Sequence, residues 1–376
     1  MASNCCSLLI LLLCCFSIAS VSSARPPDDP CAGRRIHVRR LPARFNTELL
    51  QHCGTAFPLS SDAAADPNGL SCASLANHGL GRRAHNRSRS WYRTDGRFLE
   101  PLFHHRILER DCLVAHPARA DAVFLHNFTV LTTESRAWPW QEHAVPHPTS
   151  FHPPSLPLLR GWLARARRSR RPTLMLFAGG VSKPSRPNIR GSILAECANR
   201  TGAECALVDC SGGACALDPA AYVRPMLRAR FCLQPPGDTP TRRATFDAVI
   251  AGCVPVFFEH AAARTQYGWH LPRGGYDRFS VTIPKESVVL GGVSIVDVLA
   301  AVPEAEVARM RARLLELAPR VVYRRHGSTA ELREAAKDAV EGVLRRIRRR
   351  VRALEDGHPD DIYALDDDDD DDTDLL

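Results

Sequence analysis

One segment restricts the fold of this chain more than any other, because it reads as a strand, a helix and a second strand in immediate succession. Residues 231–233 are apolar, residues 240–251 have a helical pattern that begins with proline, and residues 254–258 are apolar again. Thr239 is a good N-cap for this helix, and Gly252 is placed to end it in a left-handed turn. The order predicts the βα units of a parallel sheet.

The same alternation continues through the second region, residues 172–354. Further strands are expected at residues 173–177 and 279–283, and helices at residues 188–197, 295–301, 304–317 and 330–354. The last helix carries a heptad-like apolar seam, which packing along the sheet or between domains explains more simply than a coiled-coil dimer. We therefore expect an α/β domain with a parallel sheet in this region.

The first region, residues 31–157, has fewer regular patterns. It predicts strands at residues 36–38 and 122–125 and a helix at residues 98–108. A loop rich in Pro, His and Trp follows at residues 138–157 and is typical of a linker or a crossing between domains. With 376 residues, the chain is long enough for two domains.

The helix predicted to start at residue 240 indicates a binding site. In parallel α/β sheets, ligands lie beyond the carboxyl ends of the strands, against helix N-termini. Cations there oppose the helix macrodipole by about 0.3–1 kcal/mol unless an anion is bound. Guanidinium and helix N–H groups together suit a diphosphate, although arginines that extend into solvent are a simpler alternative. The residues expected at this point are Gly237, Asp238, Thr241, Arg242 and Arg243.

A second βα turn repeats this arrangement. Two glycines close the strand near residue 180, Asn188 is a plausible N-cap, and Arg190 and Gly191 open the next helix. Two cationic helix starts favour a bound anion over solvent-exposed arginines. Asp247 lies four residues after Arg243 and is expected to orient it through a salt bridge.

Three further residues are candidates for nucleotide or sugar contacts. Glu259, at the carboxyl end of its strand, is expected to accept hydrogen bonds from ribose hydroxyls. Tyr267 and Trp269 are candidates for stacking on a sugar or base, with a core role equally open for Trp269. Because no Asp-x-Asp pair occurs outside the acidic tail, we expect no metal and no cofactor. Arginines and the helix dipole would take the place of Mg²⁺.

The charge of the chain is unevenly distributed. From residue 355 onward there are 12 acidic and no basic residues, which leaves 49 basic against 29 acidic residues, or +20, in the rest of the chain. A charge of +20 on residues 1–354 favours anionic partners. A general enrichment of the sequence in Arg and Ala is an alternative explanation for part of this charge. The tail, residues 355–376, is predicted to be disordered.

The N-terminus and the sequons indicate the secretory pathway. Residues 5–18 are almost wholly apolar, and small residues follow them, so residues 1–24 are expected to be a signal peptide or a signal-anchor. Asn86, Asn127 and Asn199 begin N-glycosylation sequons.

Cysteines outside the leader form an even set, which in an oxidising lumen predicts disulfides. Zinc binding by the four cysteines of residues 197–215 is disfavoured because their gaps do not have the paired zinc-site spacing. Cys232 and Cys253 fit either a disulfide or buried free thiols. The ten residues are Cys31, Cys53, Cys72, Cys112, Cys197, Cys205, Cys210, Cys215, Cys232 and Cys253.

Several of these motifs resemble the exostosin-like glycosyltransferases, and within them the plant xyloglucan galactosyltransferase (KATAMARI-type) branch. The resemblance is carried by FCLQPPGDTPTRRATFDAVIAGCVPVFFE, TQYGWHLP, IRGSILAEC, FSVTIP, LPARFN and GLG…SWYRTDGRFLEPLFHHRI. It implies a GT-B fold of two Rossmann-like domains in a type II Golgi membrane protein with a lumenal catalytic part. It also implies inverting, metal-independent transfer from UDP-galactose. Arg190, Arg242, Arg243 and Asp247 match motif positions.

The chain departs from the family pattern in its first region. After residues 122–125, family members continue for several tens of residues, whereas this chain passes from Phe128 to His143 through a short unrelated bridge. We therefore expect a shortened N-terminal acceptor domain, and a truncated gene model is an alternative. Arg39-Arg40 and Glu259-His260 also differ from the usual residues of the branch.

The leading hypothesis is transfer of galactose to the xylosyl side chains of xyloglucan. The general base should come from the N-terminal domain, where His104, His105 and Glu109 are weak candidates. An inactive nucleotide-sugar-binding scaffold and a transferase for another wall glycan are alternatives. The leader and sequons oppose a nucleic-acid-binding protein, and a lectin has no need of paired cationic helix starts.

Overall fold

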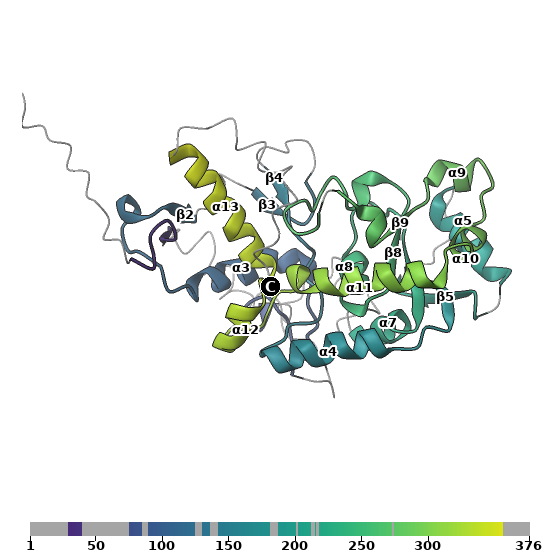
Figure 1. The fold of residues 1–376 in the computed structure, drawn as a ribbon, viewed down its shortest axis with the longest axis horizontal. Helices are drawn as coiled ribbons and strands as arrows, with labels where there is room; N and C mark the ends of the chain where they lie inside the picture. Colours follow the sequence, from purple (N-terminus) through teal and green to yellow (C-terminus); the bar gives the residue numbers. More distant parts are fainter. Residues whose placement is uncertain are drawn as a thin grey trace, which may run out of the picture.

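A five-stranded parallel sheet lies at the centre of the second half of the chain (Figure 1). Every neighbouring pair in it is parallel, which confirms the predicted mixed α/β class. The strands, in sheet order, are β6 (Cys205–Asp209), β5 (Thr173–Gly179), β7 (Ala229–Gln234), β8 (Val254–Phe257) and β9 (Val281–Thr282). The strand expected at residues 279–283 is shorter than predicted, because Phe279 ends a 3-10 turn at Tyr276–Arg278.

The computed structural model describes most of both regions. The described residues are 29–39, 75–84, 89–124, 130–135, 142–180, 187–200, 202–211, 215, 218–272 and 274–355. The expected leader, Asn86, Asn127, Cys53, Cys72 and the acidic tail beyond residue 355 lie outside them.

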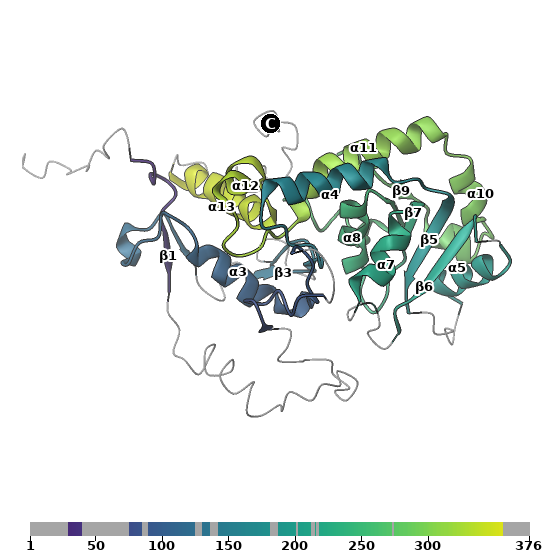
Figure 2. The same cartoon turned by 90° about the horizontal axis from the view of Figure 1, so that it is seen from below.

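Helices cover both faces of the sheet (Figure 2). One apolar core lies under α4 (Leu156–Arg168), α7 (Pro219–Met226) and α8 (Arg243–Ala251). The other lies under α5 (Ile189–Ala198), α9 (Lys285–Val289) and α10 (Ile295–Ala300). The long helix α11 (Glu304–Val321) contributes Val307 to the second core and Leu314 to the first, so it binds the two layers together.

Helix α8 begins later than the sequence predicts. Its first residue is Arg243 and its N-cap is Arg242, so the prediction of Thr239 as N-cap with Pro240 in the first turn is wrong. The preceding residues form a separate turn, in which the Gly237 N–H donates to the Thr239 carbonyl at 2.9 Å. The predicted end is confirmed, because Gly252 has φ +63° and closes the helix in a left-handed conformation.

The continuous helix expected at residues 330–354 is also wrong. It is divided into α12 (Ala330–Ala335) and α13 (Ala339–Glu355). Asp338 causes the break, because its carboxylate accepts from the Glu341 N–H at 3.1 Å and caps the start of α13. The apolar seam is therefore shared between two cores, with Leu332 in the core of α4 and Val340 in that of the N-terminal region.

The N-terminal region contains two small parallel sheets. In the first, β1 (Ile36–Val38) pairs with β2 (Ala122–Phe124), and in the second β3 (Val130–Thr132) pairs with β4 (Glu142–Ala144). Helix α3 (Leu99–Leu108) packs with β1 and with α13 in one apolar core. Within the described residues, the strands of this half form two pairs, and no larger Rossmann-like sheet is present.

The Pro-, His- and Trp-rich segment is a packed part of the structure. The sequence interpretation of residues 138–157 as a linker misses β4 and the start of α4. Thr149, Phe151 and His152 are buried. Trp162 on α4 donates its indole N–H to the Ile250 carbonyl at 2.8 Å, so this segment joins the first region to the main sheet.

Four disulfides confirm the prediction made from the cysteine count. The pairs are Cys31–Cys112, Cys197–Cys205, Cys210–Cys215 and Cys232–Cys253. The zinc alternative for residues 197–215 and the free-thiol alternative for Cys232 and Cys253 are therefore excluded. None of the described helices is both long enough and apolar enough to cross a membrane.

Candidate functional site

A cavity of about 510 Å³ opens at the carboxyl edge of the main sheet. Its walls come from the start of α5, the loop after β7 and the start of α9. Three of the predicted diphosphate-binding residues line it, namely Arg190, Gly237 and Asp238. Lys285 and Glu286 also line it; sequence analysis missed them as site residues, although they directly follow the last strand.

Arg190 is held at the cavity by the loop after β7. Its Nε donates to the Pro236 carbonyl at 3.0 Å. A Cβ atom on Gly237 would lie 2.5 Å from Arg190 Nη2, so a larger residue here would displace the guanidinium from its present position. As predicted, Asn188 caps α5, accepting from the Gly191 N–H at 2.9 Å. Burial lowers the pKa of Arg190, and Asp238 opposes that effect.

Arg242 lies beside Arg190, behind the same edge of the sheet. Its guanidinium donates to the Pro235 carbonyl at 3.0 Å and to the Ala178 carbonyl at 3.3 Å. Burial and then the charge of Arg190 lower the pKa of Arg242 to about 10. Within the described part of the chain, neither arginine forms an ion pair. Two adjacent cations held by carbonyl groups favour a bound anion.

Arg243 does not join this pair, so the prediction that Arg243 lies with Arg242 at the diphosphate site is wrong. Its guanidinium donates to the Thr94 carbonyl, the Ser150 hydroxyl and, at 3.2 Å, Tyr222 Oη. The predicted salt bridge is confirmed, with Arg243 Nε 3.5 Å from Asp247 Oδ2. Burial raises the pKa of Asp247 to about 6 even though Arg243 opposes this shift. Arg243 therefore links α8 to the first region.

Thr241, the residue before Arg242, contacts two side chains of the first region. Its N–H donates to Glu134 Oε2 at 3.0 Å, and its hydroxyl lies 3.2 Å from His147 Nε2. Burial, and next the charge of Arg243, lower the pKa of His147 to about 4, so the imidazole is neutral. Although burial opposes it, hydrogen bonding from Thr241 lowers the pKa of Glu134. No sequence pattern pointed to either residue, because both come close to Thr241 only through folding.

The other predicted nucleotide and sugar contacts have different surroundings. The Glu259 carboxylate accepts from Lys285 at the cavity. Tyr267 is fully buried and donates to the Thr133 carbonyl at 2.7 Å, so it is a core residue and not a stacking surface. Trp269 stacks on His143 with ring centroids 4.1 Å apart and is 8% exposed, in agreement with its alternative core role.

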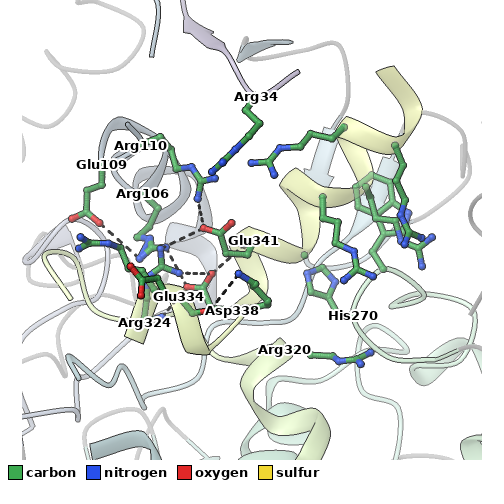
Figure 3. A pocket seen from close by; sticks show the side chains of 18 of the residues that line it. Arg34, Arg106, Glu109, Arg110, His270, Arg320, Arg324, Glu334, Asp338 and Glu341 are labelled. Carbon is green, nitrogen blue, oxygen red and sulfur yellow. Dashed lines mark hydrogen bonds and ion pairs between the residues drawn. The ribbon is translucent and has the colours of Figure 1, made fainter. Parts of the chain in front are cut away.

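A second cavity, of about 410 Å³, is lined by residues of α3 and α13 and is rich in arginine (Figure 3). Buried Arg106 lies 3.3 Å from Asp338, which also pairs with Arg324 at 3.0 Å. Glu109 lies at the edge of this network (Figure 3). The two cavities share no lining residue among those described.

The three candidate bases predicted from the sequence lie on α3 or, for Glu109, at its C-cap, and none of them lines the Arg190 cavity. Glu109 lines the second cavity, and His105 Nε2 is 3.9 Å from it. His104 stacks on Phe124 with ring centroids 6.1 Å apart. Of the three predicted glycosylation sites, Asn199 falls within the described residues and is exposed at the end of α5.

A parallel α/β sheet with two adjacent arginines at its carboxyl edge has the arrangement found at anion-binding sites of α/β proteins. Comparison with known proteins gives the family: the Exostosin GT47 domain matches residues 30–131 and 125–299. The chain therefore belongs to the exostosin GT47 family of glycosyltransferases, in agreement with the resemblance of its motifs.

Two relatives from Arabidopsis thaliana illustrate the relationship. The protein named "Probable xyloglucan galactosyltransferase GT19" is 45% identical over 411 aligned positions, which cover 86% of this chain and 92% of that protein. "Xyloglucan galactosyltransferase XLT2" is 29% identical over 405 positions, covering 85% of this chain and 76% of that protein. The similarity extends over most of each chain.

Proposed function

We propose that this chain transfers galactose from UDP-galactose to the xylosyl side chains of xyloglucan. The observation that carries the proposal is the Arg190–Arg242 pair, which lies at the carboxyl edge of the sheet with no ion-pair partner among the described residues. The relatives whose names describe xyloglucan galactosyltransferases support this donor and acceptor.

In the proposed reaction, an acceptor hydroxyl displaces UDP with inversion at the sugar carbon. Arg190 and Arg242 stabilise the charge that develops on the departing diphosphate, so the step needs no metal from the protein. A group of the first region accepts the hydroxyl proton. We assign this role to Glu134 and His147, because both residues contact Thr241 next to Arg242. Both are unprotonated at neutral pH, although their lowered pKa values make them weaker bases.

We further propose that the protein acts in the Golgi lumen, with residues 1–24 as the membrane anchor of a type II protein or as a cleaved signal. The apolar leader and the sequons support this placement. Four disulfides are also consistent with an oxidising compartment.

One observation favours a second candidate, an inactive nucleotide-sugar-binding homologue with a shortened acceptor domain. The alignment with the 45% identical relative has 411 positions, more than the 376 residues of this chain, so it contains gaps in this chain. The family domain also matches this chain in two pieces, which overlap at residues 125–131. Both facts support a loss of acceptor-side sequence near the bridge from Phe128 to His143.

A transfer assay separates the two candidates. The full chain, produced in a secretory host, is incubated with UDP-galactose and a xyloglucan oligosaccharide, and the products are identified by mass spectrometry. A galactosylated oligosaccharide is expected. Binding of UDP without product would favour the inactive homologue, and absence of both would contradict the proposed function.

A further inference from the structure

Three segments far apart in sequence bring histidines and a carboxylate together outside the Arg190 cavity. His105 lies in the last turn of α3, Glu109 is the C-cap of that helix, and His326 lies in the connection from α11 to α12. One potential ligand atom from each of these three residues lies within 4.8 Å of the other two. The His78 ring stacks on His105 with centroids 3.5 Å apart and covers one side of the group. All three potential ligands are half-buried.

The orientation of His326 is fixed by the backbone. Its Nε2 lies 3.3 Å from the His78 carbonyl oxygen, and because a carbonyl can only accept, Nε2 carries the hydrogen. The lone pair of the neutral ring is then on Nδ1, which is buried and has no hydrogen-bond partner among the described residues. A histidine that donates one N–H to a backbone carbonyl and presents its other nitrogen has the arrangement found at metal ligands.

Glu109 is oriented in a similar way. The Gly327 N–H donates to Glu109 Oε1 at 2.7 Å, and Arg106 Nη1 lies 3.8 Å from the other oxygen, Oε2. His105 Nε2 is 3.9 Å from Oε1. Oε1 keeps a second lone pair, so it can accept the backbone hydrogen bond and still bind a cation.

We propose that His105, Glu109 and His326 bind one divalent transition metal ion of the zinc class. Two imidazole nitrogens and one carboxylate oxygen are a known zinc ligand set, which leaves a fourth position for water. Imidazole ligands disfavour hard cations such as Mg²⁺ and Ca²⁺. Ligand atoms around tetrahedral zinc are about 3.3 Å apart, so binding requires the side chains to move inward from the present spacing of up to 4.8 Å.

Such an ion would connect α3 of the first region to the connection between α11 and α12. It would lie outside the proposed transfer site, because these residues neither line the Arg190 cavity nor contact Thr241. It also gives His105 and Glu109 a function other than the general base predicted from the sequence. The proposal is independent of the transfer reaction and holds whether or not the chain is active.

The test measures zinc binding and thermal stability of the full, untagged chain. After treatment with a chelator and dialysis, one Zn²⁺ per chain is expected to bind and to raise the melting temperature, while Mg²⁺ and Ca²⁺ leave it unchanged. His326→Asn and Glu109→Gln should each weaken Zn²⁺ binding by more than the roughly 10–100-fold caused by loss of an outer-shell partner. Glu109→Gln preserves size and the hydrogen bond from Gly327.

His104→Asn is the matched control, because His104 is the next residue on α3 and stacks on Phe124 outside the group. It should bind Zn²⁺ like the unaltered chain. Circular dichroism establishes that each variant is folded. Absence of stoichiometric Zn²⁺ binding, or equal binding by the folded His326→Asn and Glu109→Gln variants, would overturn the proposal.

Discussion

Arg242 and Arg243, at the start of α8, have different surroundings. We therefore expect their mutation to affect different properties: ligand binding for Arg242 and stability for Arg243. Arg242 lies beside Arg190 and donates to the Pro235 carbonyl, whereas Arg243 pairs with Asp247 and contacts the first region. The sequence motif predicted both as diphosphate ligands, since nothing in the local pattern distinguishes them. The difference depends on Thr94, Ser150 and Tyr222, which fold against Arg243 from distant parts of the chain.

Arg243→Ala is expected to destabilise the fold by about 3 kcal/mol. Removing one partner of a buried ion pair usually costs about 3–5 kcal/mol of stability. We expect the lower end of this range, because the Arg243 side chain is 22% exposed whereas that of Asp247 is 2% exposed. Chemical denaturation measures the change. Arg264→Ala, at an exposed arginine, is the control and should leave the free energy of unfolding unaltered. A fully stable Arg243→Ala protein would contradict the structural role.

Glu134→Gln and His147→Asn test the assignment of the proton acceptor. Loss of general base catalysis should lower kcat for galactose transfer by roughly 10²–10⁴-fold. The KM for UDP-galactose should change little, because Arg190 and Arg242 remain. Glu331→Gln, at an exposed position of α12, serves as the control. Unchanged kcat in both variants would place the base elsewhere.

At the scale of elements, the sequence predicted the α/β half better than the rest. The strands β5, β7 and β8 and the helices α5, α10 and α11 agree with local patterns of apolar residues and caps. The start of α8 could not be predicted, because it depends on tertiary contacts of Thr241. The break after α12 has a local signal that the sequence analysis missed, since Asp338 caps α13 by accepting from the Glu341 N–H. Likewise, β4 and α4 lie in a proline-rich segment whose composition indicates a loop.

The break between α12 and α13 depends on the buried charges of Asp338. Asp338→Asn removes the negative partner of Arg106 and Arg324, all three of which are at least 96% buried. We expect a loss of about 3–5 kcal/mol in the free energy of unfolding, the usual result of removing one partner of a buried pair. Asp297→Asn, at an Asp whose side chain is 73% exposed, should change it by less than about 1 kcal/mol. Equal stability of the two variants, measured by urea denaturation, would refute this role.

At the scale of the whole molecule, the two regions are joined through shared cores and buried polar contacts. Helix α13 packs with α3. Buried His152 donates its Nδ1–H to the Tyr323 carbonyl at 2.6 Å, and its Nε2 lies 2.8 Å from the Thr94 hydroxyl. These contacts join residues of the first region to the segment that follows α11. A single sequence predicted the sheet and its cationic edge, but it contains no local signal for such long-range packing.

The buried histidines make the stability of the whole molecule depend on pH. Burial lowers the pKa values of His147, His152 and His270 to about 4, compared with about 6.5 in the unfolded chain. Between these values the unfolded state binds more protons, so stability falls on acidification through pH 6.5 toward 4. Each histidine should remove about 1–2 kcal/mol between pH 7.5 and 5. Calorimetry at several pH values measures this fall, and a melting temperature that is flat from pH 7.5 to 5 would contradict it.

The most direct test of the central claim is protection of the fold by UDP. At about 100 times its Kd, UDP should stabilise the folded protein by about 2.7 kcal/mol and raise its melting temperature. That rise should disappear in Arg190→Ala and Arg242→Ala and persist in Arg264→Ala. A melting temperature that does not respond to UDP, or responds equally after Arg190 and Arg242 are both replaced, would contradict a diphosphate site between these two arginines.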